Sequence, residues 1–310
     1  MLGRMDLAML LDRPADLPPL VGALSLAWAF LVAACWGSFL NVVIARVPKG
    51  ESVVHPRSRC PKCQKPIAGY DNIPVFSWLL LRGKCRSCRA PIAWRYPFVE
   101  LLVGIAGMAV VARAGYSLES LELFVFICIL TAIAFVDLDT WTIPKPLYLA
   151  LIVSGAAFAG VHALVEHDAQ VLVPRAIGAV GAGVAMAAVV VVATGVARRT
   201  GKIGPDDTAM GWGDPLILVG VGAYLGWRSL PLVLFLASLQ GSVFGIIAVL
   251  SGKYQGDAPV SDDDDWVPPK HAVPFGPFLA LGALEAAFFG DAVMARVQPL
   301  FGALLGADPG

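Results

Sequence analysis

Apolar runs long enough to cross a membrane restrict the fold of this chain more than any other feature of its sequence. Several reach the roughly 17 to 25 residues that a transmembrane helix needs. Only 15% of the 310 residues are charged, against about a quarter in soluble domains. We therefore predict an all-α polytopic membrane protein with about eight transmembrane helices, within residues 20–43, 98–112, 121–136, 147–164, 171–197, 216–227, 230–250 and 275–289.

The segment 46–97 is too basic and too polar to lie in the membrane. It carries eleven of the 23 lysine and arginine residues, and its acidic residues are only Glu51 and Asp71. Because basic loops stay on the cytoplasmic side, we predict a small cytoplasmic insert and an N-terminus outside. The chain then divides into an N-terminal segment with the first helix (1–45), the insert (46–97) and a transmembrane core (98–310). Its expected partners include membrane lipid and exclude nucleic acid.

Four of the six cysteines form two C-x2-C pairs in the insert, Cys60 with Cys63 and Cys85 with Cys88. Disulfides are disfavoured in the cytoplasm, and two such pairs about 20 residues apart are typical of a tetrahedral zinc site. Four thiolates fill the coordination sphere, so the predicted Zn²⁺ is structural. A redox pair or unrelated thiols are the alternatives. We find no clear internal repeat in the chain.

Two acidic residues stand where apolar runs begin or end. Asp137 directly follows the run 121–136, while Asp139 would point elsewhere. Asp214 precedes the run 216–227 and follows Gly211 and Gly213, which allow close approach of another segment. Counting spans from the basic insert places Asp137 and Asp214 at the cytoplasmic face. For Asp214, a second interpretation is a helix N-cap followed by Pro215 at the first helical position.

A pair of carboxylates on separate helices suits the dyad of an aspartic protease. Two close carboxylates cannot both ionise easily, so one would keep its proton near neutral pH. The charged one would then take a proton from water, and the protonated one would polarise the scissile carbonyl. The pair could instead hold a divalent cation or relay protons in a transporter. We disfavour the transporter because we expect no acidic residue deep within a span.

Several spaced motifs, taken together, resemble the type IV prepilin peptidases, a family of intramembrane aspartic proteases with a Gly-x-Gly-Asp motif. The matching motifs are residues 37–43 with Arg46 and Pro48; 59–63; 70–74; Ser77-Trp78; the second cysteine pair; Arg95-Tyr96-Pro97 with Glu100; Asp137 with Ile143-Pro144; and Met210-Gly211-x-Gly213-Asp214. The resemblance implies that Asp137 and Asp214 are the catalytic aspartates, with Gly211 and Gly213 as supporting glycines.

The resemblance also implies a substrate, a second activity and a location. The family removes the basic leader of type IV prepilins or of type II secretion pseudopilins at the cytoplasmic side of the bacterial inner membrane. Many bacterial members then methylate the new N-terminus with S-adenosylmethionine. Asp71 and Glu100 are the candidates for methylation that the motifs suggest. Pairing of Glu100 with Arg95, or with another arginine of the insert, is the alternative for that residue.

Two positions depart from the family pattern. Lys145 follows Ile143-Pro144 where the family has an acidic or amide residue, and Leu216 stands where it has a lysine. Loss of a positive charge near a carboxylate disfavours its ionised form. These departures favour, to a small extent, an alternative function, in which a catalytically weak homologue binds pilin-like subunits during assembly. Asn41, a polar residue in the first span, could hydrogen-bond to another helix.

Overall fold

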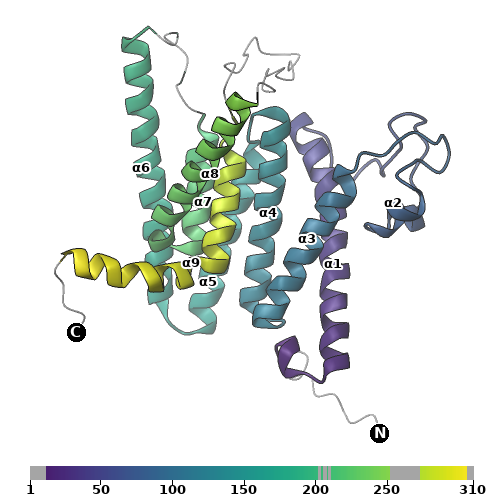
Figure 1. Cartoon of the computed structure of the whole chain (residues 1–310), viewed down its shortest axis with the longest axis horizontal. Coiled ribbons are helices and arrows are strands. Elements are labelled where there is room, and N and C mark those ends of the chain that lie inside the picture. Colours follow the sequence, from purple (N-terminus) through teal and green to yellow (C-terminus); the bar gives the residue numbers. More distant parts are fainter. Residues whose placement is uncertain (1–11, 202–203, 205–207, 209–210, 252–272, 306–310) are drawn as a thin grey trace. The chain divides into compact units, whose positions relative to one another are not determined.

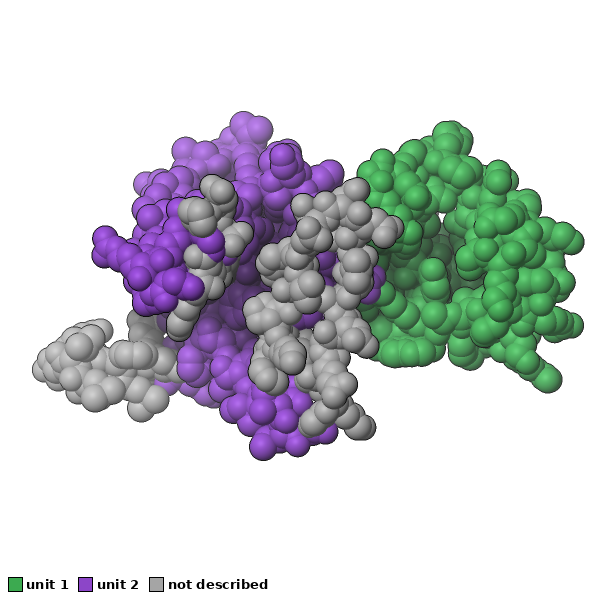
Figure 2. Space-filling model, turned by 90° about the horizontal axis from the view of Figure 1, so that it is seen from above, with its two compact units in different colours: residues 1–136 green, residues 137–310 purple. Residues whose placement is uncertain are grey.

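A computed structural model describes residues 12–201, 204, 208, 211–251 and 273–305. The acidic run at 262–265, Met210 and the pair Asp206-Asp207 lie outside the described residues. The chain forms two compact units, Met1–Val136 and Asp137–Gly310, which are coloured separately in Figure 2. This boundary falls inside a helix, and the division into 1–45, 46–97 and 98–310 stays a prediction.

The first unit is built on two long helices that lie side by side, α1 (Pro19–Arg46) and α3 (Arg95–Ala114) (Figure 1). Small residues allow their close approach: a Cβ on Gly37 would lie 2.8 Å from the Cα of Glu100, and one on Gly107 only 2.3 Å from the Cβ of Ala33. Asn41 of α1 donates through Nδ2 to the carbonyl of Tyr96 at 3.0 Å. The predicted hydrogen bond of Asn41 to another helix is therefore confirmed.

Between α1 and α3 lies the insert. It contains the short helix α2 (Phe76–Leu80), the 3₁₀ turns η3 (Val47–Lys49) and η4 (Gly69–Asn72), and otherwise irregular chain. A further helix, α4 (Leu118–Thr140), follows α3, and a 3₁₀ turn, η2 (Pro14–Asp16), precedes α1. Arg95 at the start of α3 donates to the carbonyl of Phe135 near the end of α4 and lies over its ring, a favourable place for a cation.

The second unit surrounds one short helix. α7 (Gly213–Leu225) packs against α5 (Lys145–Val165), α6 (Leu172–Arg199) and α9 (Gly276–Leu305). Most of its residues are buried. A Cβ on Gly222 would lie 2.4 Å from the backbone of Gly178 in α6, so glycines at both positions let the two helices touch. The remaining elements are α8 (Leu230–Leu250), η5 (Ala169–Val171) and η6 (Trp227–Ser229).

Each of the eight predicted apolar runs is helical, which confirms the all-α membrane fold. Within the described residues, seven helices are long and apolar enough to cross a membrane, and α7 is a shorter apolar helix. The run 216–227 is therefore the one that falls short of a full span. Since α7 is enclosed by its neighbours, its apolar character reflects burial within protein.

One expectation about the spans is wrong. Glu285 lies near the middle of the part of α9 that could cross the membrane, and it accepts a hydrogen bond from Gln240 of α8 at 2.5 Å. An acidic residue is thus present deep within a span. The argument that a transporter is disfavoured because no such residue exists therefore fails. The aspartate motifs and the comparisons below carry that decision instead.

Candidate active site and metal centre

Asp137 lies in the last turn of α4, where it is buried with 5% exposure. The helix ends at Thr140 because Trp141 takes a left-handed conformation (φ 56°) and Pro144 precedes α5. The carboxylate of Asp137 accepts a buried hydrogen bond, 3.0 Å long, from the backbone N–H of Gly276 at the start of α9. Asp139 is exposed, so the prediction that it points elsewhere is confirmed.

Asp214 lies in the first turn of α7. The helix begins at Gly213 and its N-cap is Trp212, so the N-cap interpretation of Asp214 is wrong. A carboxylate in the first turn still suits the positive end of the helix dipole. Asp137 lies close enough for its negative charge to act on the Asp214 carboxyl. The second unit thus brings together two acidic residues that are far apart in the sequence.

Gly211 and Gly213, which precede Asp214, differ in how closely other residues approach them. A Cβ on Gly213 would lie 2.8 Å from Cδ1 and 3.1 Å from Cβ of Ile143. Ile143 belongs to the motif of the first aspartate, Asp137. Gly213 therefore lets the two aspartate-bearing segments approach each other, with the side chain of Ile143, not another backbone, in the space that it leaves. A Cβ on Gly211 would meet no atom of the described residues within 4 Å. Lys145 is exposed at the start of α5, and Leu216 is half-buried in α7.

The four cysteines of the insert come together as predicted. Their Sγ atoms all lie within 4.8 Å of one another, and those of Cys60 and Cys88 are 3.7 Å apart. Zn–S bonds of about 2.3 Å in a tetrahedron place the sulfurs roughly 3.8 Å apart, so the donor set fits Zn²⁺. Backbone N–H groups of Cys63 and Lys62 lower the pKa of Cys60 to about 6, which favours the thiolate that a metal needs.

The two cysteine pairs lie in hairpins with the same hydrogen bonds. The N–H of Cys60 binds the carbonyl of Lys65, and that of Ile67 binds Ser58; at positions shifted by 25 residues, Cys85 binds Ala90, and Ile92 binds Gly83. One residue of each, Gln64 or Arg89, takes a left-handed conformation. We call residues 58–68 the first knuckle and 83–93 the second knuckle.

A sequence repeat underlies these hairpins, and the statement that the chain has no clear internal repeat is wrong. Both knuckles read Cys-x-x-Cys-x-x-Pro-Ile-Ala, at 60–68 and 85–93. A search for repeats at the level of single hairpins would have found it. Each knuckle therefore supplies two sulfurs to the cluster of four cysteines from the same local backbone geometry.

The two methylation candidates make structural contacts within the first unit. Arg86 of the second knuckle binds both oxygens of Asp71, at 2.6 to 3.0 Å, and its guanidinium holds the pKa of that carboxyl below its usual value. Glu100 accepts from the backbone N–H of Val75 at 2.7 Å. Val75 itself has a strained φ of 62°. Glu100 therefore holds the start of α2, and within the described part of the chain it forms no ion pair with Arg95 or another arginine of the insert, which was its alternative.

The fold and the paired carboxylates define a polytopic membrane protein equipped for acid–base chemistry. Comparison with known proteins places it more closely. The model named Bacterial Peptidase A24 N-terminal domain matches residues 31–114, and that of the Type IV leader peptidase family matches residues 124–246.

Relatives match along nearly the whole chain. A prepilin leader peptidase/N-methyltransferase of Myxococcus xanthus is 33% identical, over 92% of this chain and 96% of the relative. One of Aeromonas hydrophila is 34% identical, over 93% and 97%. No solved structure matches the chain. The chain belongs to the type IV leader peptidase family.

Proposed function

We propose that this protein is an aspartic endopeptidase that removes the leader of type IV prepilins or type II secretion pseudopilins, with Asp137 and Asp214 as its catalytic residues. The observation that carries the proposal is the close approach of the two aspartate-bearing segments in the second unit, where Gly213, next to Asp214, lies against Ile143 of the Asp137 motif. Family membership and the printed names of the relatives support the substrate class.

The two carboxylates would share one proton in the resting enzyme. A hydrogen bond donated to a carboxylate favours its charged form, so the Gly276 contact favours Asp137 as the base. Asp137 would take a proton from water while the oxygen attacks the scissile carbonyl carbon. Asp214 would give its proton to the carbonyl oxygen. Collapse of the tetrahedral intermediate then breaks the C–N bond, and the amine leaves with the proton that Asp137 holds. One hydroxyl of the intermediate returns its proton to Asp214, which leaves a carboxylic acid and restores the resting pair.

We further propose that the new N-terminal amine is methylated. S-adenosylmethionine, when bound, supplies the methyl group. Asp71 and Glu100 remain predictions for this step. Their contacts support a role in shaping the insert, since Asp71 fixes the second knuckle and Glu100 the start of α2. The sulfurs of Cys60, Cys63, Cys85 and Cys88 would hold Zn²⁺ as a structural ion.

The location follows from charge. The basic insert and the positive-inside rule support a bacterial inner-membrane protein whose insert and aspartates face the cytoplasm. There the basic leader of a membrane-embedded pilin helix would meet the carboxylate pair.

Mass spectrometry of a co-expressed prepilin tests the proposal. We expect a shortened pilin whose N-terminus is 14 mass units heavier (about one methylene) with the wild-type protein, and the intact leader with Asp214→Asn. Cleavage without added mass would remove the methylation proposal alone. An intact leader with both proteins would support the alternative of a catalytically weak homologue that binds pilin-like subunits.

A further inference from the structure

The start of α9 contributes a backbone group to the proposed active site. Gly276 donates its N–H to Oδ2 of Asp137 across a buried distance of 3.0 Å. The region that matches the family model ends at residue 246, so this contact comes from a part of the chain outside that match. The local sequence is Val273-Pro274-Phe275-Gly276-Pro277.

The first turn of α9 leaves one N–H for an outside acceptor. The first N–H groups of a helix have no partner within it. Here Pro277 has no N–H, and those of Phe278 and Leu279 bind the carbonyl of Phe275 at 3.1 and 3.0 Å. The remaining donor, Gly276, is the one that binds Asp137. The positive end of the helix dipole also favours a negative charge at this place.

The contact requires a residue without a side chain. A Cβ on Gly276 would lie 2.6 Å from Oδ2 of Asp137 and 3.2 Å from its Cγ. A larger residue must therefore displace either the carboxylate or the helix. Buried carboxylates with one directional partner are sensitive to such shifts, because the productive geometry of a catalytic group tolerates about half an ångström.

We propose that Gly276 is a positioning residue that orients the Asp137 carboxylate and favours its charged form. The proposal rests on the function proposed above for Asp137. It assigns to α9 a part in leader cleavage, besides its packing against α7 and α8.

Glycine-to-alanine variants of the full-length protein test this. In Gly276→Ala we expect kcat for leader cleavage to fall at least tenfold, with KM and the thermal midpoint unchanged and methyl transfer to a pre-cleaved pilin retained. Gly290→Ala is the matched control in the same helix, because its Cβ would lie 4.0 Å from the nearest atom, in Leu232. Gly282→Ala tests packing alone, since its Cβ would lie 2.9 Å from the carbonyl of Val233 in α8.

The outcomes separate the two proposals. Full cleavage by Gly276→Ala would overturn the positioning role and leave Asp137 as a catalytic residue. An equal loss in Gly282→Ala, or a parallel loss of methyl transfer in Gly276→Ala, would also overturn it, because disturbed packing would explain both. Unreduced cleavage by Asp137→Asn would instead remove the function on which the inference rests.

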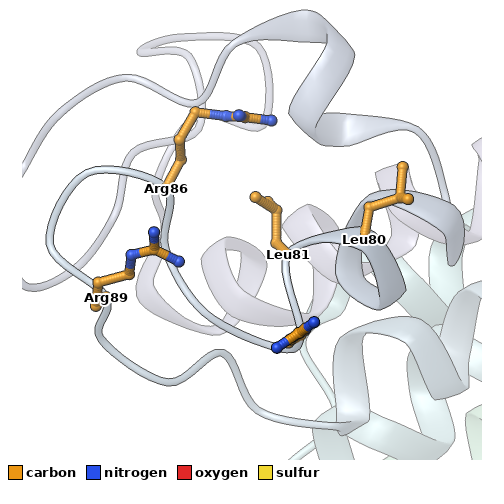
Figure 3. A pocket seen from close by; sticks show the side chains of 5 residues that line it. Leu80, Leu81, Arg86 and Arg89 are labelled. Carbon is orange, nitrogen blue, oxygen red and sulfur yellow. The ribbon is translucent and has the colours of Figure 1, made fainter.

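A second, independent observation concerns the insert. A pocket of about 280 Å³ is lined by Leu80, Leu81, Arg82, Arg86 and Arg89. Figure 3 shows four of these side chains by name, Leu80, Leu81, Arg86 and Arg89. The adjoining helix α2 exposes Phe76, Leu79 and Leu80, the last at 83%. An apolar helix face therefore adjoins three arginines, of which Arg86 is neutralised by its ion pair with Asp71, so that Arg82 and Arg89 supply the positive charge.

Two of these arginines are held in unusual conformations. Arg82 and Arg89 have φ values of 52° and 59°, which cost about 1 kcal/mol or more for a residue with a side chain. Among the described residues neither forms an ion pair. The first knuckle carries Gln64 at the position of Arg89 and Pro61 at that of Arg86. The first knuckle is also basic, through Arg59, Lys62 and Lys65. What sets the second apart is that its arginines line a pocket beside exposed leucines.

We infer that this surface docks the insert on anionic phospholipid headgroups. Both chain ends of the insert continue into helices that can cross a membrane, α1 and α3, so a lipid surface is within reach. Exposed leucines that enter the acyl boundary, with arginines at the phosphate level, are the pattern of an interfacial helix.

Hydrogen exchange of the full-length protein in nanodiscs tests the docking. With a third of anionic phosphatidylglycerol, we expect slower exchange at residues 76–92 than with phosphatidylcholine alone, and loss of this protection at high salt. Arg82→Gln/Arg89→Gln should abolish it. Lys62→Gln/Lys65→Gln, which removes the same charge from the first knuckle, should keep it. Equal protection in neutral lipid, an equal effect of the lysine variant, or protection by inorganic phosphate alone would overturn the inference.

Discussion

The cysteine cluster and the carboxylate pair represent two ways of building a site. The four sulfurs come from two neighbouring hairpins with the same hydrogen bonds and the same sequence pattern. The carboxylates come from α4 and α7, and a backbone group of α9 binds one of them. The first site depends on local geometry, and its four sulfurs would fill the coordination sphere of a tetrahedral metal ion. The second depends on the packing of helices that are far apart in the sequence.

The largest expected effect separates the two sites. Asp137→Asn or Asp214→Asn should each lower leader cleavage by about 10³-fold or more, because neither variant can share the proton that the mechanism needs. Bound zinc should stay at one ion per chain. Mass spectrometry of the pilin and elemental analysis of the purified protein measure both. Loss of zinc in these variants would contradict the independence of the two sites.

The converse test replaces cysteines of the cluster and leaves both aspartates intact. Cys60→Ser or Cys85→Ser should remove the bound zinc and loosen the insert, since a structural zinc site contributes folding free energy directly. We expect faster proteolysis within 46–97 and a smaller loss of cleavage than in the aspartate variants. Cys35→Ser, outside the cluster, is the control. A variant that keeps stoichiometric zinc would show that the cluster is not the metal site.

A smaller effect is expected where the aspartate segments touch. Gly213→Ala should lower cleavage roughly tenfold, as overpacking costs about 1 to 3 kcal/mol and separates Ile143 from α7. Gly211→Ala should stay close to wild type, because its Cβ would meet open space. In the double variant Gly213→Ala/Ile143→Val, the Cδ1 atom closest to the new Cβ is gone. This double variant should therefore regain part of the lost activity. Equal losses at both glycines would point to backbone freedom as the cause.

The smallest effect concerns the pair Asp71–Arg86. Because Arg86 lowers the pKa of Asp71 in the folded state, the pair stabilises the insert above the unfolded pKa of about 3.9. This stabilisation is lost as the pH falls through the lower, folded value. Asp71→Asn should cost about 1 kcal/mol or less at pH 7 and almost nothing at pH 2. Thermal unfolding at both pH values measures this; the same cost at both would exclude the ion pair as its source.

The sequence alone was sufficient for features that depend on length, periodicity and local spacing. Eight apolar runs predict the helices, and two C-x2-C pairs predict the cluster of four cysteines. The cluster is predictable because the position of each cysteine pair is fixed by the backbone hydrogen bonds of its own short hairpin. The recurrence of Pro-Ile-Ala after each cysteine pair is also visible in the sequence, but the repeat is only nine residues long and occurs twice. The pairing of Asp137 with Asp214 could be predicted through family resemblance and from a count of spans.

Tertiary structure decided what depends on contacts between helices. No local pattern indicates that Gly276 donates to Asp137, that Ile143 needs a glycine opposite it, or that Glu100 binds the backbone of Val75. The apolar character of α7 is the same whether lipid or protein covers it, so only packing identified it as the buried centre of its unit. Hydrophobicity and spacing act along the chain, whereas the direction of a hydrogen bond and the room for a side chain exist only once distant segments have met.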